Sequence, residues 1–256
     1  MDVLVCVKRV PMVGGRIALQ GDRRRLDTSL LGFTVSPHEE CAVEEGVRLS
    51  EAAGGSVTVL TLGPPEAVEQ LRTAISVGAH HALLLETDRD DFGPLATTRA
   101  ITRAIEGLEA ERQSPFDLLL FGNEAADTAD YQVGVRVAHA LGRPVATGIK
   151  HLEVGGGSAR ARRTYRGTEE LFILALPAVV TVKEGINLPR YPSLPGRMRA
   201  KKTVVATLRP TYEAEGLEMR SLAVPTTERR SAEVLGHGVE AVPPLVELLV
   251  KLGVIE

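Results

Sequence analysis

Residues 116–134, FDLLLFGNEAADTADYQVG, decide the fold expected of this chain. The first six residues have an almost uniformly apolar core, which is typical of a strand buried on both faces of a parallel sheet. Gly122 then allows the backbone to turn sharply, and we expect a helix over Asp127–Leu141, ended by Gly142-Arg143-Pro144. A buried strand that leads through a polar loop into a helix is the repeating unit of an α/β fold.

The same unit occurs three times before this segment. Expected strands are Val3–Val7, Ser56–Leu62, His81–Leu85 and Phe116–Phe121, and expected helices before the last strand are Ser36–Ala53, Ala67–Ile75 and Leu95–Leu108. The pattern predicts a doubly wound, mostly parallel, Rossmann-like sheet. Ligands bind such sheets outside the carboxyl ends of the strands, so we expect a site after Val7, around Ser36 and after Phe121.

The helix from Ser36 carries the clearest local signals. Ser36-Pro37-His38-Glu39 is a capping box with proline at the first helical position. Glu44 and Arg48 are spaced for a favourable i,i+4 ion pair.

The sequence changes character after residue 145. Gly155-Gly156-Gly157 predicts a hairpin turn between strands at 146–154 and 158–166, and Leu171–Val182 predicts one or two further strands. Residues 184–202 contain three prolines and are expected to be irregular. From Thr207 the chain is expected to be irregular until a short helix at Leu245–Leu252. We therefore divide the chain into an α/β domain, 1–206, and a C-terminal arm, 207–256, that packs on a partner.

Composition excludes several classes of protein. The chain has 256 residues, 44% hydrophobic, and a net charge of −3, so nucleic acid is not an expected partner. Cys6 and Cys41 have neither metal-ligand spacing nor a disulfide framework, and His80-His81 lacks further ligands. We see no secretory signal, transit peptide or bilayer-spanning run, and expect no metal site. A cytoplasmic protein, bacterial or archaeal, is predicted; in a eukaryote it would reside in the mitochondrial matrix.

The loop after the fourth strand is the main candidate for chemistry. Its backbone N–H groups and the following helix N-terminus could hold an anionic phosphate. Asp127 and Thr128 are N-cap candidates that could also reach ribose or phosphate. The alternative is an ordinary turn with an aspartate cap. The segment Gly122–Gly134 contains no lysine or arginine, which favours holding a nucleotide over hydrolysing it.

Four segments together resemble a known family. GNEAADTADYQVG is similar to the AMP-binding loop of electron transfer flavoprotein beta subunits. VLVCVKRVP resembles that family's first strand and loop, and SPHEECAVEEGVRL its second nucleotide-contacting segment. LPAVVTVKEGINLPRYPSLPGRMRAKK is similar to its late signature. The matches lie in order and span residues 3–202.

The resemblance implies a doubly wound core, also seen in adenine nucleotide alpha hydrolases, that buries AMP in a structural role. FAD would lie mainly on the alpha subunit, which the C-terminal arm would contact. The implied cofactor-binding residues are Cys6 and Leu62 through their main chains, together with Ser36, Pro37, His38, Glu39, Gly122, Asn123, Glu124, Ala125, Ala126, Asp127, Thr128, Ala129, Asp130, Tyr131, Gln132 and Val133. Two of these have plain alternatives: Cys6 as a core residue and Ser36 as an N-cap only.

This chain departs from the family's pattern at Val13 and His38, where aromatic side chains often lie near the flavin ring. His38 is a candidate modulator of the flavin potential; the alternative is a solvated histidine beside a helix start.

The resemblance also implies a partner-recognition loop within residues 184–202. Its leucine, which inserts into a pocket on partner dehydrogenases, matches Leu194. Prolines on both sides of Leu194 would limit the entropy lost on docking. The implied docking residues are Leu194, Arg190, Tyr191, Pro195, Arg197 and Arg199, and Lys201 and Lys202 extend their basic rim. The alternatives are a core leucine and a solvated basic run.

The expected function is that of an electron carrier, with no catalytic residues of its own. As a heterodimer it would pass electrons from dehydrogenases, such as the acyl-CoA dehydrogenases of fatty acid beta-oxidation, to a membrane quinone reductase. Three alternatives stay open. One is an electron-bifurcating relative with a second FAD in place of AMP. Another is a nucleotide hydrolase or adenylating enzyme, although KRVPMVGG lacks a SGGxDS-like signature. The third is a stand-alone nucleotide-binding module.

Overall fold

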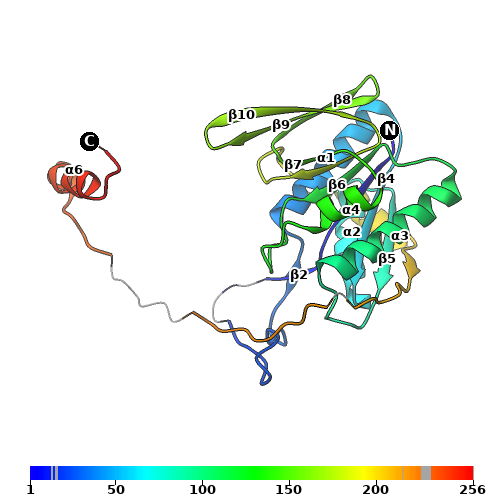
Figure 1. The fold of residues 1–256 in the computed structure, drawn as a ribbon, viewed down its shortest axis with the longest axis horizontal. Helices are drawn as coiled ribbons and strands as arrows, with labels where there is room; N and C mark the ends of the chain where they lie inside the picture. The colour runs from blue at the N-terminus through cyan, green and yellow to red at the C-terminus, as the bar shows by residue number, and fades with distance from the viewer. Residues whose placement is uncertain (13, 15–16, 215, 226–231, 256) are drawn as a thin grey trace. The chain divides into compact units, whose positions relative to one another are not determined.

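The computed structural model describes residues 1–12, 14, 17–214, 216–225 and 232–255. Its main feature is a seven-stranded sheet in which every pairing of neighbouring strands is parallel (Figure 1). The strands are β1 Val3–Cys6, β4 Val57–Gly63, β5 His81–Glu86, β6 Leu118–Gly122, β7 Val145–Ile149, β11 Ala178–Val182 and β12 Ala206–Leu208. The helices that connect them are α1 Pro37–Ala53, a 3₁₀ turn Pro65–Ala67 with α2 Val68–Val77, α3 Pro94–Arg112 and α4 Val133–Ala140.

The strand order is β12-β5-β4-β1-β6-β11-β7, so the chain reverses direction across the sheet between β1 and β6. Alternate residues of each strand enter two apolar cores. Val3 and Val5 pack with α1 and α2 on one face, whereas Leu4 and Cys6 pack with α3 and α4 on the other. The predicted doubly wound α/β fold is confirmed. Its switch point is the place where ligands bind in such folds.

Helix α1 begins as predicted. Ser36 is its N-cap. The Ser36 hydroxyl accepts a hydrogen bond from the Glu39 N–H, and the Glu39 carboxylate accepts one from the Ser36 N–H. The predicted Glu44–Arg48 pair is wrong. Arg48 pairs with Glu45 at 3.0 Å, because Glu44 is buried and bound by Arg190.

A small antiparallel sheet follows β7, made of β8 His151–Gly155, β9 Ser158–Tyr165 and β10 Thr168–Ala175 (Figure 1). The predicted glycine turn is confirmed: Gly156 and Gly157 join β8 to β9 with φ of 58° and 76°. A two-stranded ribbon, β2 Val10–Pro11 with β3 Phe33–Thr34, lies between β1 and α1 in the chain.

Two expectations for the second half are wrong. Residues 184–202 are not irregular throughout, because α5 spans Leu194–Lys202 with Ser193 as N-cap. Its proline, Pro195, lies in the first turn, where a missing N–H breaks no helical hydrogen bond. The chain is also not irregular directly from Thr207, since β12 extends the main sheet by pairing with β5.

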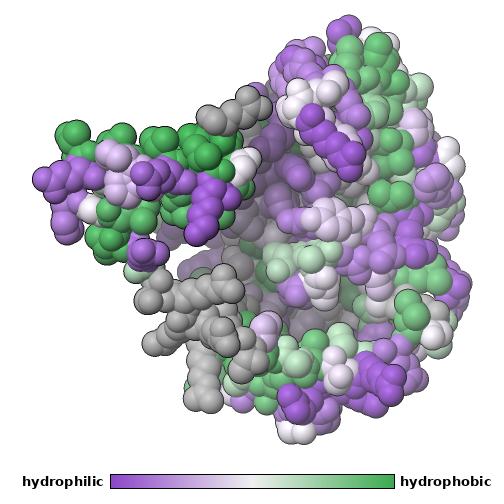
Figure 2. Space-filling model, turned by 60° about the vertical axis from the view of Figure 1, so that its left-hand side comes forward, coloured by the Kyte–Doolittle hydropathy of each residue, from purple (hydrophilic) through white to green (hydrophobic). Residues whose placement is uncertain are grey.

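The chain divides into two compact units, Met1–Arg220 and Ser221–Glu256. The second contains a 3₁₀ turn, Gly238–Ala241, and helix α6, Val242–Lys251, near the predicted Leu245–Leu252. No side chain of α6 is buried, although the helix is mostly apolar. Figure 2 shows apolar side chains over much of its surface, at the left of the view. Among the described residues, no helix is long and apolar enough to cross a membrane.

Candidate functional site

A cavity of about 210 Å³ lies at the switch point of the sheet, outside the carboxyl ends of β1, β4 and β6. Two of the three segments predicted to meet there, after Val7 and after Phe121, line it together. The third segment contributes Glu39. The lining residues are Cys6, Val7, Lys8, Glu39, Leu62, Phe92, Gly93, Pro94, Thr97, Ile101, Phe121, Gly122, Asn123, Glu124, Ala125, Thr128, Asp130, Tyr131, Val133, Gly134 and Thr181.

The loop between β6 and α4 closes on itself through main-chain hydrogen bonds. Ala125 N–H donates to Asp130 O at 3.0 Å, and Ala129 N–H donates to Ala125 O at 2.8 Å. Ala129 adopts a left-handed φ of 53°, a conformation that is uncommon for alanine and typical of functional loops. Within the described residues, the N–H groups of Glu124 and Thr128, which line the cavity, have no hydrogen-bond acceptor. They are therefore available to a ligand.

This loop corrects the predicted start of α4. The helix begins at Val133 rather than Asp127, and its N-cap is Gln132 without a side-chain cap. Asp127 and Thr128 are therefore not N-caps. The predicted helix began too early. Ala125 and Ala129 donate their N–H groups to bonds that close the loop, and a continuous helix begins only after it.

Asn123 fixes the beginning of the loop to two neighbouring strands. Its N–H donates to Val182 O at 2.9 Å, and its side-chain oxygen accepts from the Thr181 hydroxyl at 3.0 Å. The same hydroxyl accepts from Gly148 N–H at 3.1 Å. Asn123 is buried, and these hydrogen bonds hold the start of the loop in a fixed position.

Lys8 brings a positive charge to the cavity. It follows β1 and lines the cavity, and its ammonium lies 2.7 Å from the carboxylate of Asp127 in the loop. The loop sequence contains no cation, so the sequence alone predicted binding by amides only. The signal that could have identified Lys8 is its place directly after a strand whose carboxyl end faces the site.

Glu39 forms a buried wall of the cavity. Burial raises the pKa of the Glu39 carboxyl to about 7, against the opposing effects of hydrogen bonds from Ser36 and of the Lys8 charge. Gly122 packs directly on it: a Cβ at Gly122 would lie 2.6 Å from Glu39 Cγ. Gly122 is thus required for this close approach, and its φ lies outside the left-handed region, so the position needs glycine for space and not for a left-handed conformation.

His38 connects the loop to the segment after β11. Its Nδ1 accepts a hydrogen bond from Glu184 N–H at 2.7 Å, so its Nε2 carries the proton donated to Glu124 at 3.2 Å. Hydrogen bonds from Tyr131 and His38 lower the pKa of Glu124. The alternative of a solvated histidine at position 38 is wrong, because both ring nitrogens are engaged.

Comparison with known proteins decides the family. The profile of the electron transfer flavoprotein domain matches residues 26–212. The chain belongs to the electron transfer flavoprotein family. It is 36% identical to the beta subunit of Bacillus subtilis electron transfer flavoprotein over 204 residues, 79% of this chain and 76% of that one. It is 32% identical to the human beta subunit over 257 residues, covering 99% and 98% of the two chains, and 31% identical to that of Thermoanaerobacterium thermosaccharolyticum over 97% and 98%. Within this family, the chain is a beta subunit.

The remaining positions implied by the flavoprotein resemblance are distributed unevenly around the cavity. Cys6 and Leu62 line it, and burial raises the pKa of the Cys6 thiol above its usual range, so a role for Cys6 rests on its main chain. Ser36 is buried as the N-cap. Positions that do not line the cavity are Ser36, Pro37, His38, Ala126, Asp127, Ala129 and Gln132. Val13 lies outside the described residues.

One wall of this flavoprotein cavity was not predicted. The first turn of α3 lines it with Phe92, Gly93, Pro94 and Thr97. Gly93 is the N-cap and Pro94 the first helical residue. A Gly-Pro pair before an apolar helix marks a helix start, but only the sheet topology shows that this start faces the cavity.

The docking residues implied by the family resemblance differ in their contacts. Leu194 and Tyr191 are 74% and 95% exposed. Arg190 and Arg199 are bound within the chain, Arg190 to Glu44 and Glu51 and Arg199 to Ile75 O. Arg197 has no ion-pair partner in the part of the chain that the structure describes.

His80 lies in the connection between α2 and β5. Its ring Nδ1 accepts a hydrogen bond from Val57 N–H at 3.1 Å, which links this connection to β4. In the described ranges, no three or more His, Cys, Asp or Glu side chains are grouped to hold a metal ion.

Proposed function

We propose that this chain holds AMP in the switch-point cavity as a structural ligand and works as the beta subunit of a heterodimer whose alpha subunit carries FAD. The heterodimer would carry electrons from dehydrogenases, including acyl-CoA dehydrogenases, to a membrane quinone reductase. The observation that carries this proposal is the cavity itself. A closed main-chain loop and one lysine meet there at the carboxyl edge of a parallel sheet.

The residues of the cavity fit a mononucleotide. Leu62, Phe92, Ile101 and Phe121 offer apolar walls for a base, and Lys8 with the loop N–H groups offers a pole for a phosphate. The cavity volume of 210 Å³ lies below the roughly 300–1,000 Å³ usual for larger ligands. This size favours AMP over a second FAD.

The chemistry of the cavity favours retention of the nucleotide. Enzymes that transfer phosphoryl groups place several cations or a metal on the developing charge. Here Lys8 is paired with Asp127, and the Glu39 carboxyl is bonded by the N–H and the hydroxyl of Ser36. An electron-carrier subunit without its own catalytic residues agrees with this arrangement.

Two exposed apolar surfaces support an obligatory partner. One is α6, which is mostly apolar and has no buried side chain. The other is the outer face of β10, where Leu171 and Ile173 are exposed beside Arg162 and Arg160 of β9. Exposed apolar surfaces of this kind mark protein interfaces. We assign both to the alpha subunit, with residues 207–256 as the contacting arm. The assembled heterodimer would be cytoplasmic.

Co-expression with the alpha subunit tests the proposal. We expect a yellow one-to-one complex, and mass analysis of the released nucleotides should give one FAD and one AMP. Two FAD and no AMP would instead support the bifurcating type. ATP turnover by the pure chain would support the hydrolase, and a stable nucleotide-loaded monomer without affinity for the alpha subunit would support the stand-alone module.

A further inference from the structure

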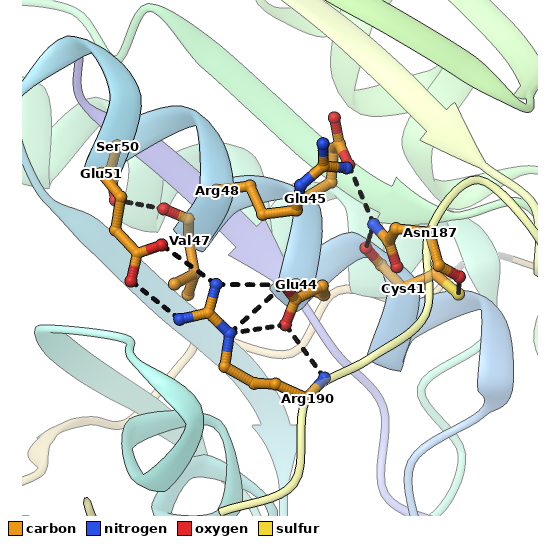
Figure 3. A network of polar contacts seen from close by, with 9 residues as sticks. All are labelled: Cys41, Glu44, Glu45, Val47, Arg48, Ser50, Glu51, Asn187 and Arg190. Carbon is orange, nitrogen blue, oxygen red and sulfur yellow. Dashed lines mark hydrogen bonds and ion pairs between the residues drawn. The ribbon is translucent and has the colours of Figure 1, made fainter.

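Arg190 is bound to α1 by a dense set of charge-assisted hydrogen bonds (Figure 3). Its Nε lies 2.9 Å and its main-chain N 3.1 Å from Glu44 Oε2, and its Nη1 lies 2.7 Å from Glu51 Oε1. The Glu44 side chain is only 7% exposed. The hydrogen bonds that Arg190 donates to Glu51 and Glu44 raise its pKa above its usual range. Arg190 therefore stays charged and in place.

The segment before Arg190 is attached to the same helix at every third residue. Glu184 N–H donates to His38 Nδ1 at 2.7 Å. Asn187 Nδ2 donates to Cys41 O at 3.0 Å and to Glu45 Oε2 at 2.9 Å, as Figure 3 shows. Residues 184, 187 and 190 thus contact successive turns of α1, and residues 184–190 form a strap along this helix.

The segment after Leu194 is attached to a different helix, α2. Gly196 packs on the Ser76 carbonyl so closely that a Cβ would lie 2.1 Å from its oxygen. Arg199 Nη2 donates to Ile75 O at 2.7 Å, and the Ser193 hydroxyl caps Gly196 N–H at 3.1 Å. Two anchors therefore bracket a short stretch that contains Tyr191 and Leu194.

We propose that Arg190 and Arg199 are positioning residues that order the stretch Tyr191–Pro195 for docking, and that neither contacts the partner dehydrogenase. This inference rests on the proposed electron transfer from dehydrogenases and on the docking role that the family resemblance implies for Leu194. It reassigns both arginines from the basic rim that the sequence suggested. Of the three arginines in that rim, only Arg197 is then expected to attract the dehydrogenase through its charge.

The physical reason is preorganisation. An exposed leucine contributes affinity only after the cost of ordering its loop, and a loop ordered beforehand reduces that cost on binding. An arginine that holds planar bidentate contacts cannot be replaced by lysine, although lysine keeps the charge. A rim arginine acts differently, since its charge steers association and makes the rate depend on salt.

The test uses the heterodimer with a purified acyl-CoA dehydrogenase and its acyl-CoA as electron donor. In Arg190→Lys, exchange of the hydrogen-bonded amides at position 190, Gly196 and Arg197, on both sides of the stretch, should become faster before any partner is added. The KM for the dehydrogenase should rise about tenfold, the order expected from ordering a few side chains on binding, with kcat unchanged. The salt dependence of kcat/KM should stay that of wild type.

Glu51→Gln provides a second variant that leaves the buried Glu44–Arg190 contact intact, and it should change exchange and KM in the same direction but less. Arg72→Lys, at an exposed pair with Glu69 on α2, should change neither. Arg197→Gln should weaken the salt dependence without faster exchange.

Unchanged exchange and KM in both Arg190→Lys and Glu51→Gln would overturn the proposal. A raised KM with unchanged exchange in Arg190→Lys would overturn it as well, because the loss would then come from direct contact with the dehydrogenase and not from ordering of the stretch. If Leu194→Ala leaves KM unchanged, the docking function itself fails, while exchange still shows whether Arg190 orders the stretch.

Discussion

Gly122 and Glu39 touch at the wall of the switch-point cavity with no space for a methyl group between them. A Cβ at Gly122 would lie 2.6 Å from Glu39 Cγ and 3.4 Å from the Glu39 main-chain nitrogen. The last residue of β6 and the first turn of α1 are therefore in direct contact. This contact fixes the position of the binding loop relative to the helix.

Gly122→Ala should displace Glu39 into the cavity and lower the AMP content of the purified heterodimer well below one per complex. The control is Gly107→Ala on the exposed side of α3, where no atom lies within 4 Å of the added Cβ. That variant should keep its AMP and gain up to about 1 kcal/mol of helix stability. Full AMP content in Gly122→Ala would contradict the assigned site.

Glu39 should make stability depend on pH. Its pKa is about 7 when folded, against 4.5 for the free side chain, so the folded chain binds this proton more tightly. The contribution of this bound proton to the free energy of unfolding is complete below about pH 4.5. It is lost as the pH rises through 7 and amounts to about 3 kcal/mol. Urea unfolding of Glu39→Gln should show a smaller loss of stability between pH 5 and 8 than wild type. Glu69→Gln, at an exposed pair on α2, should follow wild type.

Lys8→Gln should weaken AMP binding by roughly 10–100-fold, the range expected for one charge-assisted hydrogen bond. The substitution also leaves the Asp127 carboxylate unpaired near the phosphate. Isothermal titration of heterodimer stripped of nucleotide measures the effect. Arg72→Gln removes a comparable surface cation from α2 and should bind AMP as wild type does. Equal affinities of Lys8→Gln and wild type would place the phosphate elsewhere.

Leu194→Ala should raise the KM for an acyl-CoA dehydrogenase about tenfold or more and leave AMP and FAD contents unchanged, because a central apolar anchor contributes most of the energy at such contacts. Val204→Ala removes another highly exposed apolar side chain just after α5. Its KM should match wild type. An equal rise in both variants would indicate a general surface effect.

Helix α6 should gain protection when the alpha subunit binds. A ten-residue helix with no buried side chain is marginal in water. Hydrogen exchange at its amides should therefore be fast in the isolated chain and slow in the heterodimer. Unchanged exchange would show that the alpha subunit does not cover this helix.

Much of the fold was predictable because its signals are local. Apolar runs such as Leu118–Phe121 and the capping box at Ser36 report on neighbouring residues, and the structure confirms the strand and the cap. Sequence-based predictions were wrong where a residue far away in the chain binds a side chain that was expected to pair locally. Glu44 was expected to pair with Arg48 four residues away, but it pairs with Arg190 in a segment that follows by 146 residues.

By itself, the sequence determined the alternation of strands and helices, the loop after β6 and the family, because these depend on residue order and short-range preference. The tertiary structure alone decided that Lys8 and the start of α3 line this cavity, and that Arg190 pairs with Glu44 and Glu51. The physical reason is that charge pairing and close packing depend on distances through space. The sheet sets those distances by bringing together strand ends that lie far apart along the chain.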